Sequence, residues 1–334
     1  MDEQQRTRTP ASRTVAAEDQ SAWSQRRTDV GIILNPKHAA TRRAYAALVQ
    51  GLRSASAHYR SVTTSVERSG HRQAEQLIRW GADIVIILGG DGTIRAAAPV
   101  LAEAEILTFL VPGGTANVLC RHIGLGSSRH AIDHCVGTVA TIIRGGTTSS
   151  LNVPINTAEL RQADGSRHRS GFISLAGIGG DARAVAHHHA APGLAGYAWG
   201  AARALFAADF TLRTGEVGPR PVWSVMASKA TRPAGPIVVF PEARIDAEAF
   251  SVLTVGPLPH QFTARCRAWA GIAAACLQGR PQAHPLMDYR RTTETAIVLE
   301  SPVPAQLDGD LIGDCLELRV NAGERKLRVS APTT

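Results

Sequence analysis

The amino-acid sequence predicts two folded domains of different class: an open α/β sheet followed by a mostly antiparallel β-sandwich. Three observations favour this division. The 334 residues are enough for about two domains. Apolar runs alternate with helix-like segments as far as Gly145-Gly146, which is typical of an open α/β sheet. After that point, short β-branched runs separated by Gly, Pro and Asp prevail, as in an antiparallel sandwich.

The same pattern sets the expected domain boundaries. Residues 1–27 are polar and charged and cannot bury enough apolar surface to offset the entropy of ordering, so we expect a disordered tail. The α/β domain is expected at residues 28–148 and the sandwich at residues 149–313. Residues 314–334 are predicted as C-terminal strands that could return to the first domain.

The first domain is predicted to alternate between strands and helices. Its clearest strand is 83–88, a continuous β-branched run that is typical of a parallel sheet covered on both faces. A strand at 30–34 ends at Asn35-Pro36, which indicates a turn. The other expected elements are a helix at 40–53, a strand at 61–66, a helix at 71–80, a helix ending near 104 and a strand at 106–111.

The second domain is predicted to be mostly strands. They are expected at 172–175, 222–227, 237–240, 251–255, 296–300, 315–320 and 326–329. Helical segments at 193–208 and 260–278 interrupt them. The first of these helices contains Tyr197 and Trp199, and we expect it to pack on the sandwich, with a lipid surface as the alternative.

Composition excludes several classes of protein. With 44% hydrophobic and 19% charged residues, wholesale disorder is excluded. The net charge of +8 fits an anionic partner such as a nucleotide or phospholipid, or simply a basic proteome. The five cysteines are odd in number and form no Cys-x-x-Cys pair, so we expect reduced thiols in a cytoplasmic protein. No long apolar run or signal peptide is visible, so any membrane contact is expected to be peripheral.

Two glycine-rich loops carry the chemistry of the first domain. Gly89–Thr93 follows the 83–88 strand, and its glycines let backbone N–H groups approach a phosphate at the start of a helix. Within it, Asp91 can face a metal ion or a ribose. A second loop, Pro112–Asn117, follows the next strand, so both loops are expected at the carboxyl edge of the sheet. Together they predict the two walls of a phosphate cleft.

These loops resemble those of the soluble diacylglycerol kinase and sphingosine kinase family of lipid kinases. The family carries an Asn-Pro strand end, a Gly-Gly-Asp-Gly-Thr loop and a Pro-x-Gly-Thr-x-Asn loop. Here these correspond to Asn35-Pro36-Lys37, Gly89–Thr93 and Pro112–Asn117. Residues 172–182, 241–246 and 307–310 are similar to later motifs of the family, in the same order along the chain.

The resemblance implies an NAD kinase/diacylglycerol kinase-like fold with ATP and Mg²⁺ between the two domains. It implies that the following residues bind ATP: Asn35, Pro36, Lys37, Thr64 (with Thr63 as the alternative), Gly89, Gly90, Asp91, Gly92, Thr93, Gly113, Gly114, Thr115 and Asn117. Asp91 and Asp246 are the implied metal ligands, and Asp308 and Asp310 the implied catalytic residues. Phosphoryl transfer needs positioned phosphates, a cation and a carboxylate near the attacking hydroxyl, which agrees with these assignments.

Several positions depart from the family pattern. Arg95-Ala96 replaces Asn-Glu after the first loop, and Val118 replaces an Asp after the second. Ser174 stands for an Asn, and Ala247 for the second Asp of an Asp-Asp-Gly motif. Asp310 is one methylene shorter than the family Glu. These departures imply either an acceptor other than diacylglycerol or low activity.

The leading interpretation is an ATP-dependent lipid kinase that transfers the γ-phosphate to the hydroxyl of a diacylglycerol-like or sphingoid-base lipid. The lipid is expected to be reached from the membrane surface by a cytoplasmic, peripherally associated protein. Two alternatives stay open: an NAD kinase, and a nucleotide- or lipid-binding regulator without turnover. Nothing in the sequence resembles a nucleic-acid module, and homodimerisation is left open.

Overall fold

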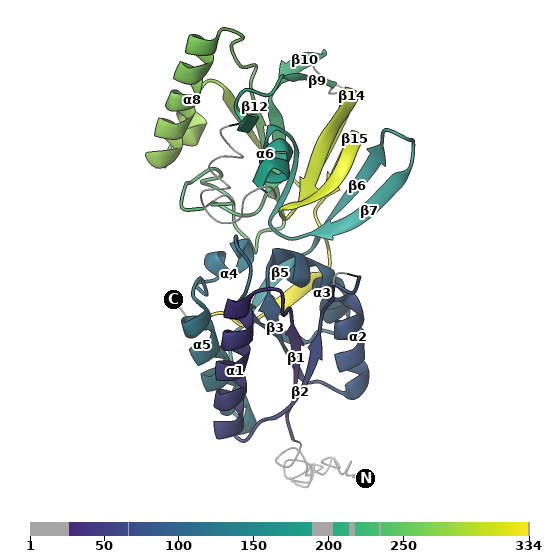
Figure 1. Cartoon of the computed structure of the whole chain (residues 1–334), viewed down its shortest axis with the longest axis vertical. Helices are drawn as coiled ribbons and strands as arrows, with labels where there is room; N and C mark the ends of the chain where they lie inside the picture. The colour runs from purple at the N-terminus through teal and green to yellow at the C-terminus, as the bar shows by residue number, and fades with distance from the viewer. Residues whose placement is uncertain (1–26, 66, 189–202, 214–217, 234, 333–334) are drawn as a thin grey trace, which may run out of the picture.

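The computed structural model describes residues 27–65, 67–188, 203–213, 218–233 and 235–332. The tail predicted at 1–27 therefore lies outside the described residues except for Arg27. The described chain forms two domains stacked along the long axis of the molecule (Figure 1). The chain leaves the first domain once and returns to it at the C-terminus.

The first domain is an open sheet with helices on both faces. Its elements are β1 (Asp29–Leu34), α1 (Ala39–Ser54), β2 (His58–Thr63), α2 (His71–Trp80), β3 (Ile84–Gly89), α3 (Asp91–Glu103), β4 (Leu107–Pro112), α4 (Val118–His122), α5 (Ser128–Ile143), β5 (Leu151–Pro154) and β16 (Lys326–Val329). The hydrogen-bonded order is β2-β1-β3-β4-β16-β5, and the first four strands are parallel. Helices α1 and α5 cover one face, and α2 and α3 cover the other (Figure 1).

The core of this sheet follows directly from the sequence pattern. Every residue of β3 and of β4 is buried, as expected for strands between two helical layers. On α1, Ala44, Leu48 and Leu52 are buried on one face, so the apolar side of that helix packs on the sheet. This packing holds the carboxyl ends of β1, β3 and β4 side by side at the edge that faces the second domain.

The second domain is antiparallel. Its elements are β6 (Asn156–Gln162), β7 (Arg167–Phe172), β8 (Leu175–Gly179), α6 (Gly180–His188), β9 (Phe210–Arg213), β10 (Arg220–Val222), β11 (Ser224–Ser228), β12 (Phe250–Val255), α8 (Phe262–Leu277), η2 (Pro281–Ala283), β13 (Met287–Thr292), β14 (Glu294–Leu307) and β15 (Asp310–Asn321). The strands hydrogen-bond into one ten-stranded sheet, ordered β13-β12-β11-β8-β14-β15-β6-β7, with β9 and β10 attached beside β14.

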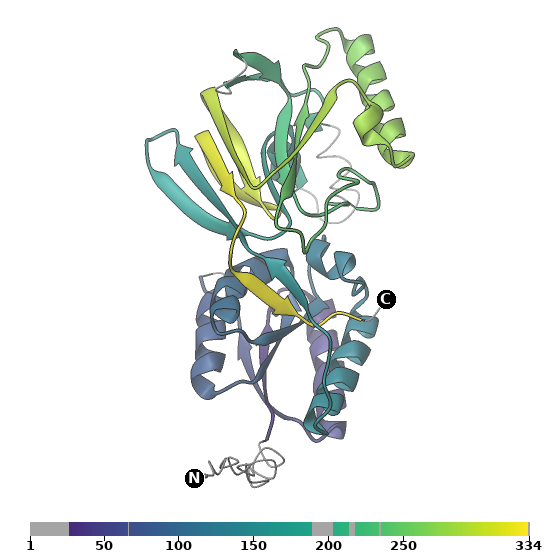
Figure 2. The same ribbon diagram turned by 180° about the vertical axis from the view of Figure 1, so that it is seen from behind.

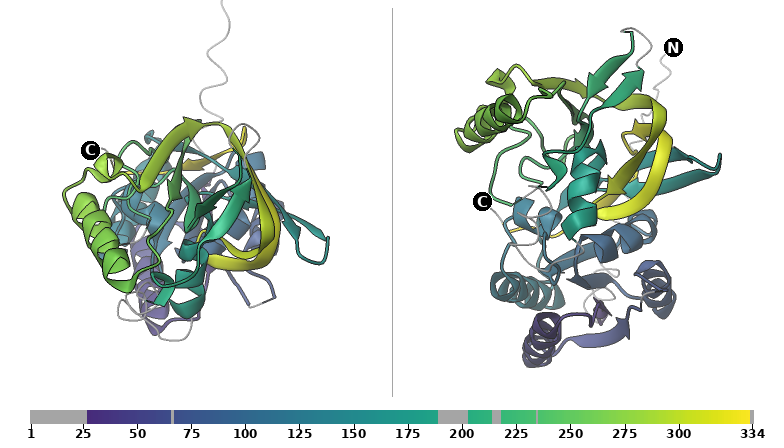
Figure 3. Two further views of the ribbon diagram at one scale, coloured as in Figure 1. Left: turned by 90° about the horizontal axis from the view of Figure 1, so that it is seen from above. Right: turned by 45° about the horizontal axis from the view of Figure 1, so that its top comes forward.

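This sheet curls around its own core. The long strands β14 and β15 bend strongly (Figure 3), and β14 pairs with β9 near Val298 and with β8 near Ala305. Side chains such as Phe172, Ile178 and Val252 therefore meet in one apolar cluster. On the other face of β11 and β12, α8 and the segment around Phe240 form a second cluster. The predicted fold class, an α/β domain followed by an antiparallel β domain, is confirmed.

The two domains are joined by two chain crossings that lie side by side. Figure 2 shows the β5–β6 connection beside the one between β15 and β16. The Ile155 N–H donates to the Arg325 carbonyl at 2.9 Å and ties the crossings together. The structure places β5 in the first sheet, beyond the boundary predicted after residue 148, and β15 in the second sheet.

Two predicted strands differ from the structure, and one predicted helix lies partly outside the described residues. Residues 237–240 form no strand, because prolines at 236 and 241 bracket them and the Val239 and Phe240 N–H groups both donate to the Thr231 carbonyl. The strand predicted at 172–175 is broken, since β7 ends at Phe172 and β8 begins at Leu175. Residues 193–202 of the helix predicted at 193–208 lie outside the described residues. Among the described helices, none is long and apolar enough to cross a membrane.

Candidate functional site

A cleft of about 920 Å³ lies between the two domains. Its first-domain wall comes from the carboxyl edge of the open sheet and the start of α3. Its second-domain wall comes from β7 and the turn between β14 and β15. This position is where open α/β sheets bind ligands, and the volume lies within the usual range for small-molecule sites.

The two glycine-rich loops pack backbone against backbone at this edge. The Gly113 N–H donates to the Gly89 carbonyl at 2.9 Å, continuing the pairing of β3 with β4. A Cβ added to Gly114 would lie 2.7 Å from the Gly90 Cα, so no larger residue fits at position 114 without a shift. The glycines therefore permit the close approach of the two loops, as their spacing in the sequence predicted.

Asn117 shapes the second loop from within. It adopts a left-handed backbone conformation with φ of 45° and precedes α4. Its Oδ1 accepts the Gly114 N–H at 2.8 Å, and its Nδ2 donates to the Gly114 carbonyl at 2.7 Å. Outside the loop, the Thr41 hydroxyl donates to the Gly113 carbonyl at 3.2 Å. Asn117 thus braces the loop, while Thr115 beside it is exposed.

Asp91 links the first loop to the second. It is the first residue of α3, and its carboxylate accepts the N–H groups of Val118 at 3.1 Å and Leu119 at 3.4 Å. Burial raises the pKa of Asp91 to about 6, against the opposing effect of these hydrogen bonds. The nearby Asp308 raises it further. A carboxyl with this pKa changes its charge close to neutral pH.

Asp308 is held in the turn between β14 and β15 by three backbone donors. Its carboxylate accepts the N–H groups of Ile173, Ser174 and Leu175 at 2.8, 2.7 and 3.0 Å. In return, its own N–H donates to the Leu175 carbonyl at 2.8 Å. Burial raises the pKa of Asp308, and the three N–H groups oppose that change. These contacts anchor the turn to the bend between β7 and β8.

Asp310 lies two residues further on and lines the cleft. Its Oδ2 accepts a hydrogen bond from the Arg95 guanidinium at 2.5 Å. A second Arg95 nitrogen donates to the Ser170 hydroxyl at 3.3 Å. The Arg95 side chain is 18% exposed and the Asp310 side chain is 49% exposed. The carboxylate of this pair is therefore more open to solvent than the guanidinium. Arg95 therefore joins α3 to both β7 and the β14–β15 turn.

The cleft brings together part of the predicted site. The predicted residues that line it are Asn35, Pro36, Lys37, Thr64, Gly92, Thr93 and Asp310. Within this group, the Asn35 amide donates to the Thr93 hydroxyl at 3.1 Å. The predicted residues that lie behind or beside the lining are Gly89, Gly90, Asp91, Gly113, Gly114, Thr115, Asn117 and Asp308.

Asp246, predicted as a metal ligand, does not line the cleft. It lies in the loop before β12, where both its oxygens accept from the Arg244 guanidinium at 3.2 and 3.0 Å. This pairing lowers the pKa of Asp246. Within the described ranges, no three His, Cys, Asp or Glu side chains come together as a metal site. Of the two predicted metal ligands, Asp91 therefore lies beside the cleft and Asp246 does not.

A further group of residues lines the cleft that was not predicted from the sequence. They are Ser65, Ser69, His71, Arg95, Ala96, Pro99, Arg169, Ser170 and Gly171. Arg95 could have been found, because it follows Asp91 by four residues and therefore shares a face of α3 with it. The β7 residues carried no local signal, since only the packing of the second domain brings that strand to the cleft.

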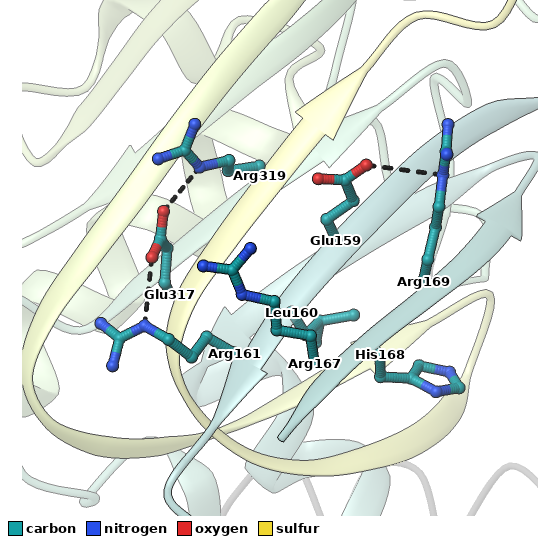
Figure 4. A pocket seen from close by; sticks show the side chains of 8 residues that line it. All are labelled: Glu159, Leu160, Arg161, Arg167, His168, Arg169, Glu317 and Arg319. Carbon is teal, nitrogen blue, oxygen red and sulfur yellow. Dashed lines mark hydrogen bonds and ion pairs between the residues drawn. The ribbon is translucent and has the colours of Figure 1, made fainter. Parts of the chain in front are cut away.

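A second, smaller hollow of about 420 Å³ lies on the face formed by β6, β7 and β15 (Figure 4). The strand register sets two rows of charges across it, Glu317-Arg161-Arg167 and Arg319-Glu159-Arg169. Arg161 and Arg319 both pair with Glu317, at 3.2 and 2.6 Å, and Arg169 pairs with Glu159 at 3.5 Å. Cross-strand ion pairs of this kind stabilise strand pairing, so the hollow is explained without a ligand.

Comparison with known proteins supports the motif-based resemblance. Residues 29–151 match the diacylglycerol kinase catalytic domain. No curated protein sequence matches the chain. A diacylglycerol kinase from Bacillus anthracis str. Sterne is similar in structure, with 15% identity, a TM-score of 0.59, and coverage of 91% of this chain and 97% of that one. Yeast NADH kinase complexed with NADH gives 13% identity, a TM-score of 0.52, and coverage of 92% and 85%. At these identities the structural matches show the fold alone, and the family resemblance rests on the match of residues 29–151 to the diacylglycerol kinase catalytic domain.

Proposed function

We propose, from the premise that the chain carries a diacylglycerol kinase catalytic domain, that it is an ATP-dependent lipid kinase. The γ-phosphate of ATP would pass to the hydroxyl of a diacylglycerol-like or sphingoid-base lipid. The observation that carries this proposal is the cleft in which the glycine-rich edge of the first sheet faces the carboxylate of Asp310. A kinase needs this opposition of phosphate-binding backbone and acidic side chain.

The first-domain wall has the chemistry to bind nucleotide phosphates. Gly92 and Thr93 lie in the first turn of α3, a helix of 13 residues whose N-terminus favours anions. Arg95 adds a fixed positive charge one turn further on, and Lys37 lines the same wall. The Arg95 Nε is buried and has no hydrogen-bond partner among the described residues. We therefore assign Arg95 to the phosphates, in place of the uncharged Asn that the family carries at this position.

The second-domain wall supplies the proton acceptor. Of the two predicted catalytic acids, Asp310 faces the cleft, whereas the carboxylate of Asp308 is occupied by three backbone N–H groups. We assign Asp310 as the general base and Asp308 as the residue that positions the turn. The acceptor hydroxyl would give its proton to Asp310 while its oxygen forms a bond to the γ-phosphorus, and the bond from that phosphorus to ADP would break.

Magnesium fits this site only together with the nucleotide. Mg²⁺ is usually held by one or two carboxylates, water and substrate phosphates. Of the two predicted metal ligands, Asp91 is the one beside the cleft, and two N–H groups already hold its oxygens. We therefore propose that Asp91 and the phosphates would share the ion, whose charge would offset that of the phosphates. Asp246 has no part in this arrangement, because it pairs with Arg244 outside the cleft.

One observation favours a second candidate, a nucleotide- or lipid-binding regulator without turnover. The ion pair with Arg95 ties up the carboxylate that would accept the proton. Turnover would require Arg95 to move from Asp310 to the phosphates when ATP binds. If ATP does not displace Arg95, the protein would bind ligands without transferring phosphate.

A radiolabel transfer assay tests the proposal. The full chain is incubated with [γ-³²P]ATP, magnesium and vesicles that contain diacylglycerol or a sphingoid base, with NAD as a soluble third acceptor. Label in an extracted lipid is the expected result. Label in NAD alone would replace the lipid kinase with a NAD kinase. ATP binding without transfer to any acceptor would favour the regulator.

A further inference from the structure

We propose that the outer face of α8 (Phe262–Leu277) docks this protein on an anionic lipid surface. The proposal rests on the lipid kinase function above for its purpose, because a lipid kinase must meet its substrate at a membrane. The surface in question is formed by α8 and the segment around Phe206. Figure 1 shows α8 at the edge of the second domain, away from the first domain.

The composition of α8 is unusual for a helix at a protein surface. Thr263, Arg265 and Arg267 are its only polar residues. A helix that is apolar around most of its circumference is normally covered on all sides. Here the described part of the chain covers one side of α8 only, and Figure 3 shows the helix beside the sheet at the edge of the domain.

The inner face of α8 is firmly attached. The buried Arg265 guanidinium donates to the Leu205 carbonyl at 2.8 Å and to the Ala207 carbonyl at 2.5 Å, and it pairs with Asp209 at 3.4 Å. The Trp269 indole also donates to the Leu205 carbonyl, at 3.1 Å. These bonds fix the rotation of the helix about its axis, so its outer face is a defined surface.

The outer face carries a continuous apolar stripe. Phe262 is 68% exposed at one end and Leu277 is 74% exposed at the other. Phe206 stacks on Phe262 with ring centroids 5.2 Å apart and an interplanar angle of 12°. The stripe is defined by Phe206, Phe262, Ala270, Ala273, Ala274 and Leu277, all of them exposed. Aromatic and aliphatic side chains in this arrangement suit insertion between lipid headgroups.

The charges around the stripe select the occupant. No Asp or Glu occurs between Glu248 and Asp288, a stretch that includes all of α8. Arg267 and Arg280 are exposed beside the stripe. Anionic lipids complement this charge, because basic residues near such a surface are attracted to its negative potential. A second copy of α8 would bring the same positive charges and no acid to pair with them, which disfavours self-association.

Vesicle sedimentation tests the proposal with matched variants of the full chain. The vesicles are phosphatidylcholine with and without phosphatidylglycerol. Phe262→Ser with Leu277→Ser should weaken binding to the anionic vesicles by about tenfold for each side chain. The control Ile237→Ser changes an exposed apolar residue outside α8 and should bind as the wild type does. Arg267→Glu should weaken binding by at least about tenfold, while the same change at the exposed Arg43 of α1 should not.

Two further measurements keep the outcomes distinct. Mg-ATP affinity and thermal unfolding should be unchanged in every variant, which shows that the fold and the cleft are intact. Stripe-dependent vesicle binding without any lipid phosphorylation would leave the docking surface standing and remove the kinase. Equal vesicle binding by the double variant and the wild type would overturn the proposal, as would a wild type that binds no vesicle. A dimer in solution that the double variant dissociates would assign the stripe to a second copy instead.

Discussion

Asp308→Asn should mainly lower the stability of the protein, whereas Asp310→Asn should mainly lower its turnover. The Asp308 carboxylate accepts three backbone N–H groups, two on Oδ1 and one on Oδ2. An Asn at this position has one accepting oxygen, so its NH₂ group must face at least one of these donors. The change also removes the charge that strengthens the remaining bonds. Because Asn tolerates the left-handed backbone of residue 308 (φ of 50°), the substitution tests the hydrogen bonds rather than the turn.

The expected magnitude follows from these contacts. One buried donor left unsatisfied and two weakened bonds should destabilise the second domain by about 2–3 kcal/mol. For a domain of this size, that lowers Tm by about 5–10 °C. Asp310 is half exposed, and its ion pair with Arg95 contributes at most about 1 kcal/mol. Asp310→Asn should therefore leave Tm nearly unchanged and lower turnover by roughly 10²–10⁴-fold, the usual contribution of a general base.

Scanning calorimetry and the lipid phosphorylation assay measure the two effects on the same samples. The assignment is refuted if Asp308→Asn keeps its Tm and loses turnover, because Asp308 would then be the base. It is equally refuted if Asp310→Asn turns over like the wild type. Asp310→Glu serves as the control, since it restores the family residue and should retain activity.

Three further predictions concern the first domain. Gly114→Ala should destabilise this domain by about 1–3 kcal/mol and weaken nucleotide binding, because the added Cβ would lie 2.7 Å from the Gly90 Cα. The control Gly126→Ala should be tolerated. Chemical denaturation measures the stability of both variants. Arg95→Gln should weaken Mg-ATP binding by about tenfold in calorimetry, with Arg43→Gln as the control of equal charge. In the folded protein the pKa of Asp91 is about 6, above its usual value of 3.8, so the folded state binds this proton more tightly than the unfolded state. The resulting stabilisation of about 3 kcal/mol is present at low pH and is lost as the pH rises from about 4 to about 6. Asp91→Asn should flatten that slope in pH-dependent unfolding, and an unchanged slope would contradict the raised pKa.

Much of the first domain could be predicted from the sequence, because its strands and glycine-rich turns are each marked by residues that are close together in the chain. The buried β-branched run of β3 and the glycines after it lie within a few residues of each other, so a short stretch of sequence is enough to predict the strand and the turn that follows it. The two loops were predicted to lie side by side, because each follows a parallel strand and the carboxyl ends of parallel strands lie at the same edge of the sheet. The antiparallel class of the second domain also followed, since its strands are short and separated by turn residues.

The parts that could not be predicted depend on contacts between distant residues. Arg95 meets Asp310 across 215 positions of the chain, and no pattern near either residue indicates the other. The three donors to Asp308 come from residues 173–175, where a β-branched run predicted a continuous strand. The need to turn those N–H groups toward a carboxylate breaks the strand there. Residues 237–240 likewise have strand-like composition but pack as a loop against Tyr289, whose hydroxyl donates to the Val239 carbonyl at 2.7 Å.

The central claim is that the cleft between the sheets is where a nucleotide's γ-phosphate meets an acceptor hydroxyl. A crystal structure of the full chain with magnesium and a non-hydrolysable ATP analogue tests this most directly. We predict phosphates at Gly92 and Thr93, the Arg95 guanidinium turned from Asp310 to the phosphates, and the Asp310 carboxylate free beside the γ-phosphate. A nucleotide bound outside the cleft, or one that leaves the Arg95–Asp310 pair intact, would contradict it.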